Sequence, residues 1–247
     1  MNSRTRAAAA AGAATAVAAG VAIYGGQYPT AQMYGPTIHR ERGAGRRIAL
    51  TYDDGPNPER TPGLLELLAR HDAQATFFLI GKWAEREPEL IRRTVAAGHA
   101  IGNHTFTHPT MPAHGAARIR EELRRCRTAV EASGERFSTV DGEMLMRPPY
   151  GRRRPGTLRT MRQEGYVPVT WSITGYDWRR TTTANAITRR CLKATEGDII
   201  LLHDGSDVEP AADRSRSIQS TERILEHYAP QGYEFVTVPE LVAAARA

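Results

Sequence analysis

From Arg47 onward the chain alternates short apolar runs with longer amphipathic stretches, and few folds accommodate that alternation. The runs with the length and composition of a strand are 48–52, 75–80, 99–103, 144–147, 166–171, 198–202 and 233–238. Other stretches have helical spacing or residues typical of helix starts and stops. One begins at Thr61, and the others span 87–97, 114–132, 155–164, 183–194 and 215–228. Strands that alternate with helices form a parallel sheet with helices packed on it, so the sequence predicts an α/β fold.

Polar side chains follow several of these strands, at the point where each strand ends or shortly after it. They are Asp53-Asp54, His104, Arg147, Asp177 and His203. The carboxyl ends of parallel strands meet on one face, and in a closed barrel that face carries the active site. Since the chain has about seven strand signals, a closed ring is favoured over an open sheet. The prediction is a distorted (β/α) barrel with about seven parallel strands.

Two segments of different composition precede this region. Residues 1–24 carry Arg4 and Arg6 and then an uncharged run, which is the layout of a signal peptide or signal anchor. Residues 25–46 are rich in Gly, Pro, Gln and Thr and are predicted to be a linker that wraps onto the domain. The domain is expected to span 47–247. An export signal predicts a periplasmic, cell-surface or secreted protein, which an uncleaved leader would anchor to a membrane.

Charge and cysteine content narrow the range of partners. The formal net charge is +6, from 33 Lys and Arg against 27 Asp and Glu, which would suit a polyanion. Nearly all of the positive charge is arginine, with Lys only at Lys82 and Lys193, so codon bias explains the basic composition equally well. No stretch alternates aromatic and basic residues as a nucleic-acid-binding surface does, so we expect no nucleic-acid partner. We expect membrane contact only through residues 1–24. Cys126 and Cys191 fall in separate predicted helices and are expected to be buried, unpaired thiols.

The pair Asp53-Asp54 at the end of an apolar run suggests a cation. Two adjacent carboxylates are unfavourable together, and a bound cation removes that repulsion. His104 and His108, four residues apart, can supply two imidazoles to the same cation. One Asp and two His leave coordination positions open for water, as a catalytic metal needs. The sequence therefore predicts a metal-dependent hydrolase.

Five segments of the chain match one family in order. They are Thr51-Tyr-Asp-Asp-Gly-Pro56, His104-Thr-Phe-Thr-His108, Arg147-Pro-Pro-Tyr-Gly151, Asp177-Trp178 and Leu201-Leu-His203. Over residues 47–238 the chain thereby resembles the polysaccharide deacetylases of carbohydrate esterase family 4, the NodB-homology domain. The resemblance implies a NodB-like barrel and a catalytic domain at 47–247. It also implies an enzyme that removes N-acetyl groups from amino-sugar glycans.

The resemblance also implies a role for each motif residue. The implied ligands of one divalent metal, usually Zn2+ but also Co2+ or others, are Asp54, His104 and His108. Asp53 is the implied general base for the metal-activated water, and Arg147 the residue that orients and tunes it. His203 is the implied general acid that protonates the leaving amine. The implied substrate-binding residues are Pro148, Tyr150, Asp177, Trp178 and Leu201, among which Tyr150 offers a backbone N–H to the oxyanion and Trp178 and Leu201 line a pocket for the acetyl methyl group.

One position departs from the family pattern. The family's fourth motif usually carries a further Asp three residues before the Asp-Trp pair, which tunes the catalytic His, and here Thr174 occupies that position. A missing carboxylate would lower the pKa of His203 and alter the pH dependence of activity. Three other carboxyl groups are candidates to replace it: Asp177, Asp204 and Asp207. The hypothesis is an active enzyme with an altered acidic limb of its pH profile, in which a Thr174→Asp variant shifts an activity-linked pKa upward.

The resemblance implies an N-acetylated glycan as substrate, such as peptidoglycan, chitin, chitooligosaccharide or exopolysaccharide glucosamine, with acetylxylan for esterase members. Arg152-Arg153-Arg154 and Arg179-Arg180 are expected either to edge the groove and favour an anionic glycan, or to form a solvated surface. Two alternatives stay open. One is the same chemistry on a formylated lipid sugar or a small amide, and the other is a catalytically silent glycan-binding surface protein. The metal identity, the oligomeric state and leader cleavage are not determined by the sequence.

Overall fold

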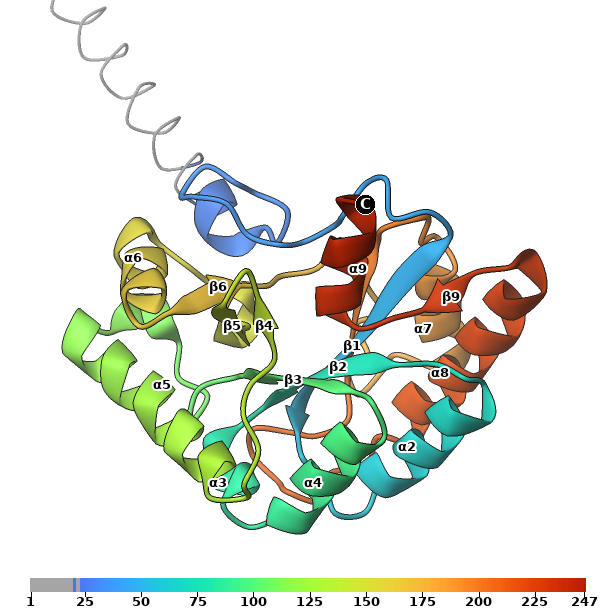
Figure 1. Ribbon diagram of the computed structural model, residues 1–247, viewed down its shortest axis with the longest axis horizontal. Helices are drawn as coiled ribbons and strands as arrows, with labels where there is room; N and C mark the ends of the chain where they lie inside the picture. Colours follow the sequence, from blue (N-terminus) through green and yellow to red (C-terminus); the bar gives the residue numbers. More distant parts are fainter. Residues whose placement is uncertain (1–19, 21–22) are drawn as a thin grey trace, which may run out of the picture.

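The computed structural model describes residue 20 and residues 23–247, so the predicted leader lies almost wholly outside the described part. The strands are β1 Arg47–Gly55, β2 Ala75–Leu79, β3 Ala100–Asn103, β4 Thr139–Val140, β5 Glu143–Met146, β6 Tyr166–Pro168, β7 Ile173–Thr174, β8 Ile199–His203 and β9 Glu234–Phe235. The α-helices are α2 Thr61–Arg70, α3 Gly81–Ala84, α4 Pro88–Ala96, α5 Ala116–Glu131, α6 Pro155–Gln163, α7 Ala184–Cys191, α8 Ser215–Tyr228 and α9 Val238–Ala245. The helices surround the strands (Figure 1), which confirms the α/β prediction.

Seven strands lie parallel in the order β6-β5-β3-β2-β1-β8-β7, and β4 adds an antiparallel strand beside β5. The two outermost strands, β6 and β7, belong to one extended segment, residues 166–174. The segment pairs first with β5, where Tyr166 lies opposite Met144. It then pairs with β8, where Thr174 lies opposite Leu201. This segment therefore closes the ring and produces the distorted barrel that the sequence predicts.

Side chains of β1 alternate between two layers of the core. Those that pack outward among the helices are Ile48, Leu50 and Tyr52. Ala49 packs on the inner side, in a smaller cluster that includes Phe78 and Leu201. Asp53 follows on the inner face four residues later. The barrel interior is therefore apolar near the start of β1 and becomes polar toward the carboxyl ends of the strands.

Helix α9 closes the amino-terminal end of the barrel, near the start of β1 (Figure 1). Its Val238 joins the inner hydrophobic cluster and donates its N–H to the hydroxyl of Thr76 in β2. The expected strand over 233–238 is therefore too long, because the chain turns into a helix after β9. Thr237 and Glu240 form a capping box at that turn. This Thr-x-x-Glu spacing ahead of an apolar run is a sequence signal for the helix.

Residues 25–46, called here the N-terminal strap, pack along the segment that closes the barrel. Ile38 forms a parallel bridge with Val169, next to β6. Arg40 forms an antiparallel bridge with Asp198, next to β8, and its Nε donates to the Asp198 carboxylate at 2.6 Å. The strap was expected to wrap onto the domain, and these bridges show that it does so by backbone pairing.

A buried arginine holds the strap against the loop after β5. Arg153 is 1% exposed, and its guanidinium donates to the backbone carbonyl oxygens of Gly151, Tyr28, Pro29 and Ala31 at 2.6 to 3.2 Å. The expectation that Arg153 edges a substrate groove is therefore wrong. Its neighbours in sequence, Arg152 and Arg154, are exposed.

An Arg153→Ala variant is expected to unfold more easily, by about 2–4 kcal/mol, because hydrogen bonds from a charged donor contribute about 1.5–3 kcal/mol each. Urea unfolding measures this change, and limited proteolysis should show faster cleavage within the strap. Arg152→Ala is the matched control, since its side chain is exposed. Equal unfolding free energies for the two variants would contradict the clamp.

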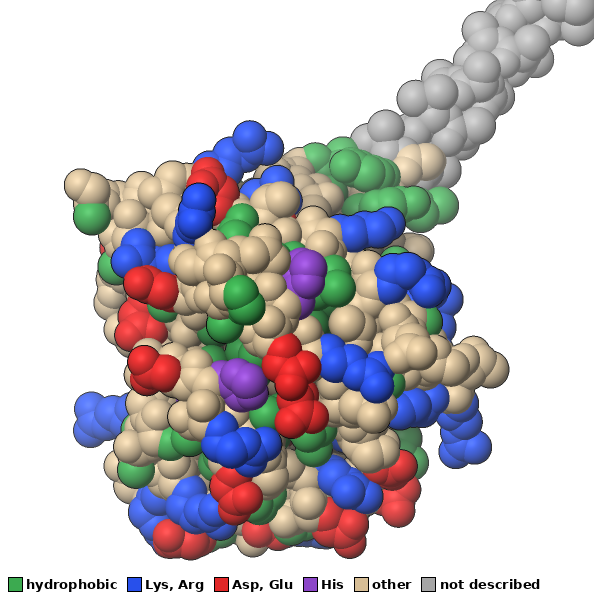
Figure 2. All heavy atoms as spheres, turned by 90° about the vertical axis from the view of Figure 1, so that its right-hand side faces the viewer, with side chains coloured by type: hydrophobic (Ala, Val, Ile, Leu, Met, Phe, Trp, Pro, Cys, Tyr) green, Lys and Arg blue, Asp and Glu red, His purple; other side chains and the backbone are tan. Residues whose placement is uncertain are grey.

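Two further expectations concern the cysteines and the surface. Cys126 and Cys191 are both buried with free thiols, as predicted. On the face shown in Figure 2, Lys and Arg side chains are interspersed with Asp and Glu, without a continuous basic area.

Among residue 20 and residues 23–247, no helix has both the length and the apolar character needed to cross a bilayer.

Candidate active site

A cavity of about 350 Å³ opens where β1, β3 and β8 end. The residues that line it are Asp53, Asp54, His104, His108, Tyr150, Trp171, Trp178, Leu201, His203, Ser206, Asp207 and Arg214. The five sequence segments singled out above therefore converge on one site, although up to about 150 positions separate them along the chain. The carboxyl-terminal face of the barrel brings them together.

Three buried side chains form a cluster that could hold a metal ion. Asp54 Oδ1 lies 3.5 Å from His104 Nε2 and 3.4 Å from His108 Nε2. One ligand atom from each residue lies within 4.8 Å of the other two. Asp54 Oδ1 is buried and has no hydrogen-bond partner among the described residues. A buried carboxylate oxygen without a donor is unfavourable, and a cation between it and two imidazoles satisfies it, so these residues fit a divalent metal.

The environment of His104 sets its protonation. Burial lowers the pKa of His104 to about 4, so the ring is neutral at physiological pH. Its Nδ1 lies 2.7 Å from the carbonyl oxygen of Arg147, which can only accept, so Nδ1 carries the hydrogen. The lone pair is therefore on Nε2, the atom that faces Asp54. This is the tautomer that a metal ligand needs.

The loop that carries the two histidines is fixed from both sides. Thr105 adopts a positive φ of 67°, and its N–H donates to Asn103 Oδ1 at 2.7 Å. From helix α5, the buried carboxylate of Glu122 accepts the backbone N–H groups of Phe106 and Thr107. These bonds turn the chain sharply after β3, so that His104 and His108 face the same point.

Asp53 is held by a fully buried arginine inside the barrel. Arg147 Nη1 donates to Asp53 Oδ1 at 2.7 Å and to the Thr51 hydroxyl at 2.8 Å. Its guanidinium also lies over the ring of Phe78, 4.2 Å from the centroid. Asp53 Oδ2 remains on the side of His104, 3.6 Å from its Nε2. The two oxygens of Asp53 thus have different neighbours, one the arginine and the other the metal cluster.

His203 lies directly beside Asp53 in the barrel, since the two residues are in register on β8 and β1. Its Nδ1 lies 2.9 Å from Asp177 Oδ1, and its backbone N–H donates to Asp177 Oδ2. Burial lowers the pKa of His203, but the Asp177 carboxylate raises it, with smaller contributions from Asp54 and Asp53, and the pKa rises to about 9. His203 is therefore a protonated imidazole at neutral pH.

Asp177 supplies the carboxylate that Thr174 does not. Of the three candidates to replace the missing Asp, only Asp177 bonds to His203. Asp204 instead accepts from the Thr61 hydroxyl, and Asp207 from His108. The first of the three candidates therefore takes the place of the missing Asp, and the pKa of His203 is raised instead of lowered. The hypothesis of an altered acidic limb loses its basis.

The predicted substrate-binding residues separate into two groups. Tyr150, Trp178 and Leu201 line the cavity, and the Trp178 ring lies edge-on to His203, 5.2 Å between centroids. Pro148 and Asp177 do not line it. Asp177 is 2% exposed and lies behind His203, where it also accepts from the Ser217 hydroxyl, so its position does not suit contact with a substrate.

Unusual backbone conformations gather at this site. The non-glycine residues with positive φ that lie in or beside the cavity are Asp54, Thr105, His108, Tyr150 and Tyr176. At Asp54, with φ 73°, the register of β1 against β2 shifts between Asp53 and Gly55. Successive residues of a regular strand face opposite sides. The shift is what lets both Asp53 and Asp54 face one cavity.

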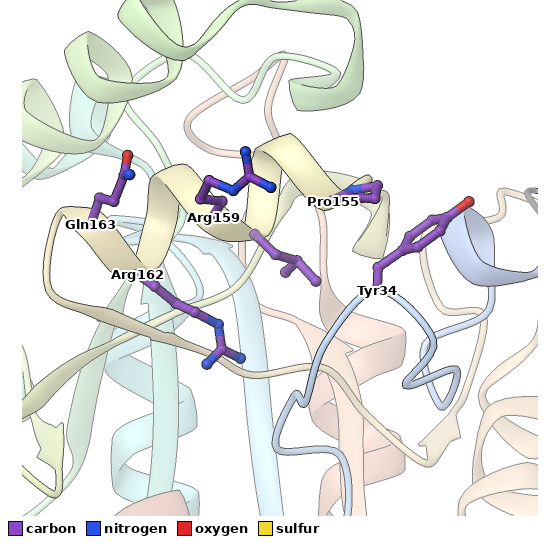
Figure 3. Close-up of a pocket in the computed structure, with 6 residues that line it drawn as sticks. Tyr34, Pro155, Arg159, Arg162 and Gln163 are labelled. Atoms are coloured by element: carbon purple, nitrogen blue, oxygen red, sulfur yellow. The ribbon is translucent and has the colours of Figure 1, made fainter.

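Trp171, Ser206 and Arg214 also line the cavity, although no motif in the sequence marks them, and Asp207 lines it although the sequence suggests only a tuning role for it. Asp207, Ser206 and Arg214 follow β8 within 11 residues of His203, and loops after barrel strands are where site residues gather. A larger hollow, about 460 Å³, lies between α6 and the N-terminal strap (Figure 3). Among the described residues that line it, which include Tyr34, Arg159 and Arg162, none carries a carboxylate, imidazole or thiol.

The polysaccharide deacetylase family model matches residues 40–169, more than half of the chain. The chain belongs to the polysaccharide deacetylase family. A peptidoglycan-N-acetylglucosamine deacetylase of Bacillus cereus is 35% identical over 199 residues, which cover 79% of this chain and 87% of that protein. A chitooligosaccharide deacetylase of Bradyrhizobium sp. is 35% identical over 204 residues, 79% of this chain and 90% of that protein.

A solved structure extends the family likeness to the fold. The family 4 carbohydrate esterase from Streptomyces lividans, in complex with acetate, superposes with a TM-score of 0.69 at 29% identity, over 81% of this chain and 95% of that one. The polysaccharide deacetylase fold is thus shared across nearly the whole of the related chain. These relatives support deacetylation of amino-sugar glycans as the family activity of this chain.

Proposed function

We propose that this protein is a metal-dependent hydrolase that removes N-acetyl groups from an amino-sugar glycan of the peptidoglycan or chitin class. One observation carries the proposal. Asp53 and His203 lie in register on adjacent strands and flank the cluster Asp54, His104 and His108 in a single cavity. A candidate base on β1 and a candidate acid on the adjacent strand β8 thus lie next to a candidate metal site.

Asp53 is proposed as the base. Its Oδ1 is occupied by Arg147, so Oδ2 is the oxygen free to accept a proton from the attacking water. A divalent cation bound at the three ligands, for which we propose Zn2+, would polarise the amide carbonyl and make water nucleophilic at neutral pH. Arg147 holds Asp53 in the orientation that keeps Oδ2 turned toward His104.

His203 is proposed as the acid. Its Nδ1 is held by Asp177, so the hydrogen that it can donate is on Nε2. Addition of the water oxygen to the amide carbon opens the carbonyl double bond to an oxyanion, and Asp53 takes the water proton. When that double bond re-forms, the carbon–nitrogen bond breaks, and His203 Nε2 protonates the departing sugar amine, which leaves acetate. The carboxylate of Asp177 fixes the ring and keeps it in the acid form until that step.

The walls of the cavity suit a small acyl group. Leu201 and the rings of Trp171 and Trp178 give an apolar lining next to the polar cluster. A methyl group fits such a surface, and Tyr150 on the rim is half exposed, where an aromatic ring can stack against a sugar. We propose that the protein acts outside the cytoplasm, where the predicted leader at 1–24 would deliver it to a cell-wall or extracellular glycan.

The deciding experiment is acetate release by the full-length chain, since the strap is part of the fold. The substrates are chitooligosaccharides, peptidoglycan and acetylxylan, with a formylated amino sugar as the alternative. We expect acetate from an amino-sugar glycan. Activity should be lost on chelation and restored by Zn2+ or Co2+. His104→Ala should bind no stoichiometric metal and release no acetate, because it removes one of the three ligands.

Other outcomes separate the alternatives. Formate release without acetate release would assign the same chemistry to a different acyl group. Stoichiometric metal and glycan binding without release of either acid would favour a silent glycan-binding protein. A protein that binds no divalent metal would overturn the proposed mechanism.

A further inference from the structure

We propose that Asp207, on the loop between β8 and α8, is a positioning residue that fixes the imidazole of His108 for metal binding. The inference rests on the proposed metal site and adds a residue that no family motif of the sequence analysis contains. Asp207 lies outside the three-residue cluster that faces the ion.

One carboxylate oxygen makes two contacts that bear on the site. Asp207 Oδ2 lies 3.2 Å from His108 Nδ1 and accepts a hydrogen bond from the Tyr150 hydroxyl at 3.3 Å. On the other side of the imidazole ring, Nε2 faces Asp54 at 3.4 Å. A carboxylate on Nδ1 holds the hydrogen there and leaves the Nε2 lone pair toward the ion.

The loop that presents Asp207 is itself tied down. From α3, Trp83 Nε1 donates to the carbonyl oxygen of Ser206 at 2.8 Å, and Lys82 Nζ donates to the carbonyl oxygen of Asp207 at 2.5 Å. Two anchors on consecutive residues place the carboxylate of Asp207 from outside the cavity. His104 receives the equivalent support from a backbone carbonyl, that of Arg147.

The two histidine ligands are therefore supported differently. His104 donates to a neutral, buried carbonyl oxygen, whereas His108 faces a charged carboxylate that is one-third exposed. A carboxylate on Nδ1 raises the electron density at Nε2 and strengthens the bond to the metal. Because the same oxygen binds Tyr150, Asp207 also links the metal ligand to a side chain on the cavity rim.

The test is the affinity of the full-length protein for Zn2+ and Co2+, measured by competition with a chromogenic chelator. Asp207→Ala is expected to weaken both affinities by about 10- to 100-fold. Asp207→Asn keeps an acceptor but removes the charge, so it should fall between Asp207→Ala and the unaltered protein. Glu209→Ala, which removes an exposed acid two residues along the same loop, should leave the affinities unchanged.

Two further readouts distinguish positioning from a general loosening of the loop. The visible absorption spectrum of the Co2+ protein should change in Asp207→Ala, because the geometry at His108 changes. Tyr150→Phe, which removes only the hydroxyl contact, should retain the metal affinity. The proposal would be overturned if the metal affinities of Asp207→Ala stayed within about twofold of those of the unaltered protein. It would also be overturned if Tyr150→Phe lost as much metal affinity as Asp207→Ala.

This test does not depend on the substrate. Metal affinity and the Co2+ spectrum can be measured on a protein that releases no acetate, so a failure of the proposed deacetylase activity leaves the assignment of Asp207 open to measurement. Conversely, if the protein is an active deacetylase and Asp207→Ala leaves its metal affinity unchanged, this inference alone is contradicted. Circular dichroism of the metal-free variants confirms that each is folded.

Discussion

Replacing Asp53 with asparagine is expected to lower kcat by about 10²- to 10⁴-fold, the usual contribution of a positioned general base. The amide keeps the shape of the carboxylate but cannot accept the proton from water. The metal ligands Asp54, His104 and His108 are untouched, so metal affinity should be retained. Steady-state acetate release and chelator competition on the same preparation measure both quantities. Loss of metal together with activity would show that Asp53 is a ligand instead of the base.

The same variant should also lose stability, for a reason specific to the barrel interior. Arg147 is fully buried, and Asp53 is the carboxylate with which it pairs. Removing one partner of a buried pair costs on the order of 3 kcal/mol, because the remaining charge is uncompensated. A double variant, Asp53→Asn with Arg147→Met, should recover part of this loss without regaining activity. If the double variant is no more stable than Asp53→Asn alone, the buried charge is not the source of the loss.

Replacing Asp177 with asparagine is expected to move the alkaline limb of the activity profile. In the unaltered protein the pKa of His203 is about 9, so the acid form persists well above neutrality. Without the carboxylate, the largest influence that raises the pKa of His203 is lost while burial still lowers it, so this pKa should fall well below about 9. Activity at about pH 8 should then drop by about 10- to 100-fold, since only a small fraction of His203 carries the proton. The measurement is kcat from about pH 5 to about pH 10.

Stability gives an independent measurement on the same pair. The pKa of His203 is raised on folding, so the ion pair stabilises the fold fully below about pH 6.5 and loses that contribution as the pH rises through about 9. The difference in melting temperature between the unaltered protein and Asp177→Asn should therefore narrow at alkaline pH. Thr174→Asp is the matched control and should leave the alkaline limb in place, because Asp177 already bonds to His203. Coincident pH profiles for Asp177→Asn and the unaltered protein would contradict the assignment.

The buried parallel strands of the barrel could be predicted from the sequence. Strand β8 is a nearly continuous apolar run and β1 is largely apolar before its Asp pair, and both are buried, so they can be recognised without knowledge of their neighbours. The polar residue at the end of each, Asp53 or His203, then falls on the carboxyl-terminal face by the geometry of a parallel barrel. The family motifs added the role of each residue but did not change its predicted place.

Sequence reasoning was insufficient where the outcome depends on contacts between distant segments. Strand β7 has only two residues, and its pairing with β8 exists because the segment from β6 crosses to it. The bond between Asp177 and His203 is a tertiary contact. The sequence offered Asp177 both as a substrate-binding residue and as one of three candidates to tune His203, and only the fold decides between these roles. Arg153 looks like part of an exposed basic run, and only the position of the strap shows that it is buried.

The positive φ angles at the cavity have a consequence for how such a site is lost. Asp54, Thr105 and His108 hold conformations that glycine adopts freely and that cost other residues on the order of 1–3 kcal/mol each. At these positions, therefore, a mutation that abolishes chemistry can also relieve backbone strain. A population of variants selected for thermal stability alone would be enriched in glycine at these positions. Such variants would keep the barrel fold and lose catalytic activity. Selection for turnover would be needed to keep the carboxylate of Asp54 and the imidazole of His108 at positions where the backbone conformation favours glycine.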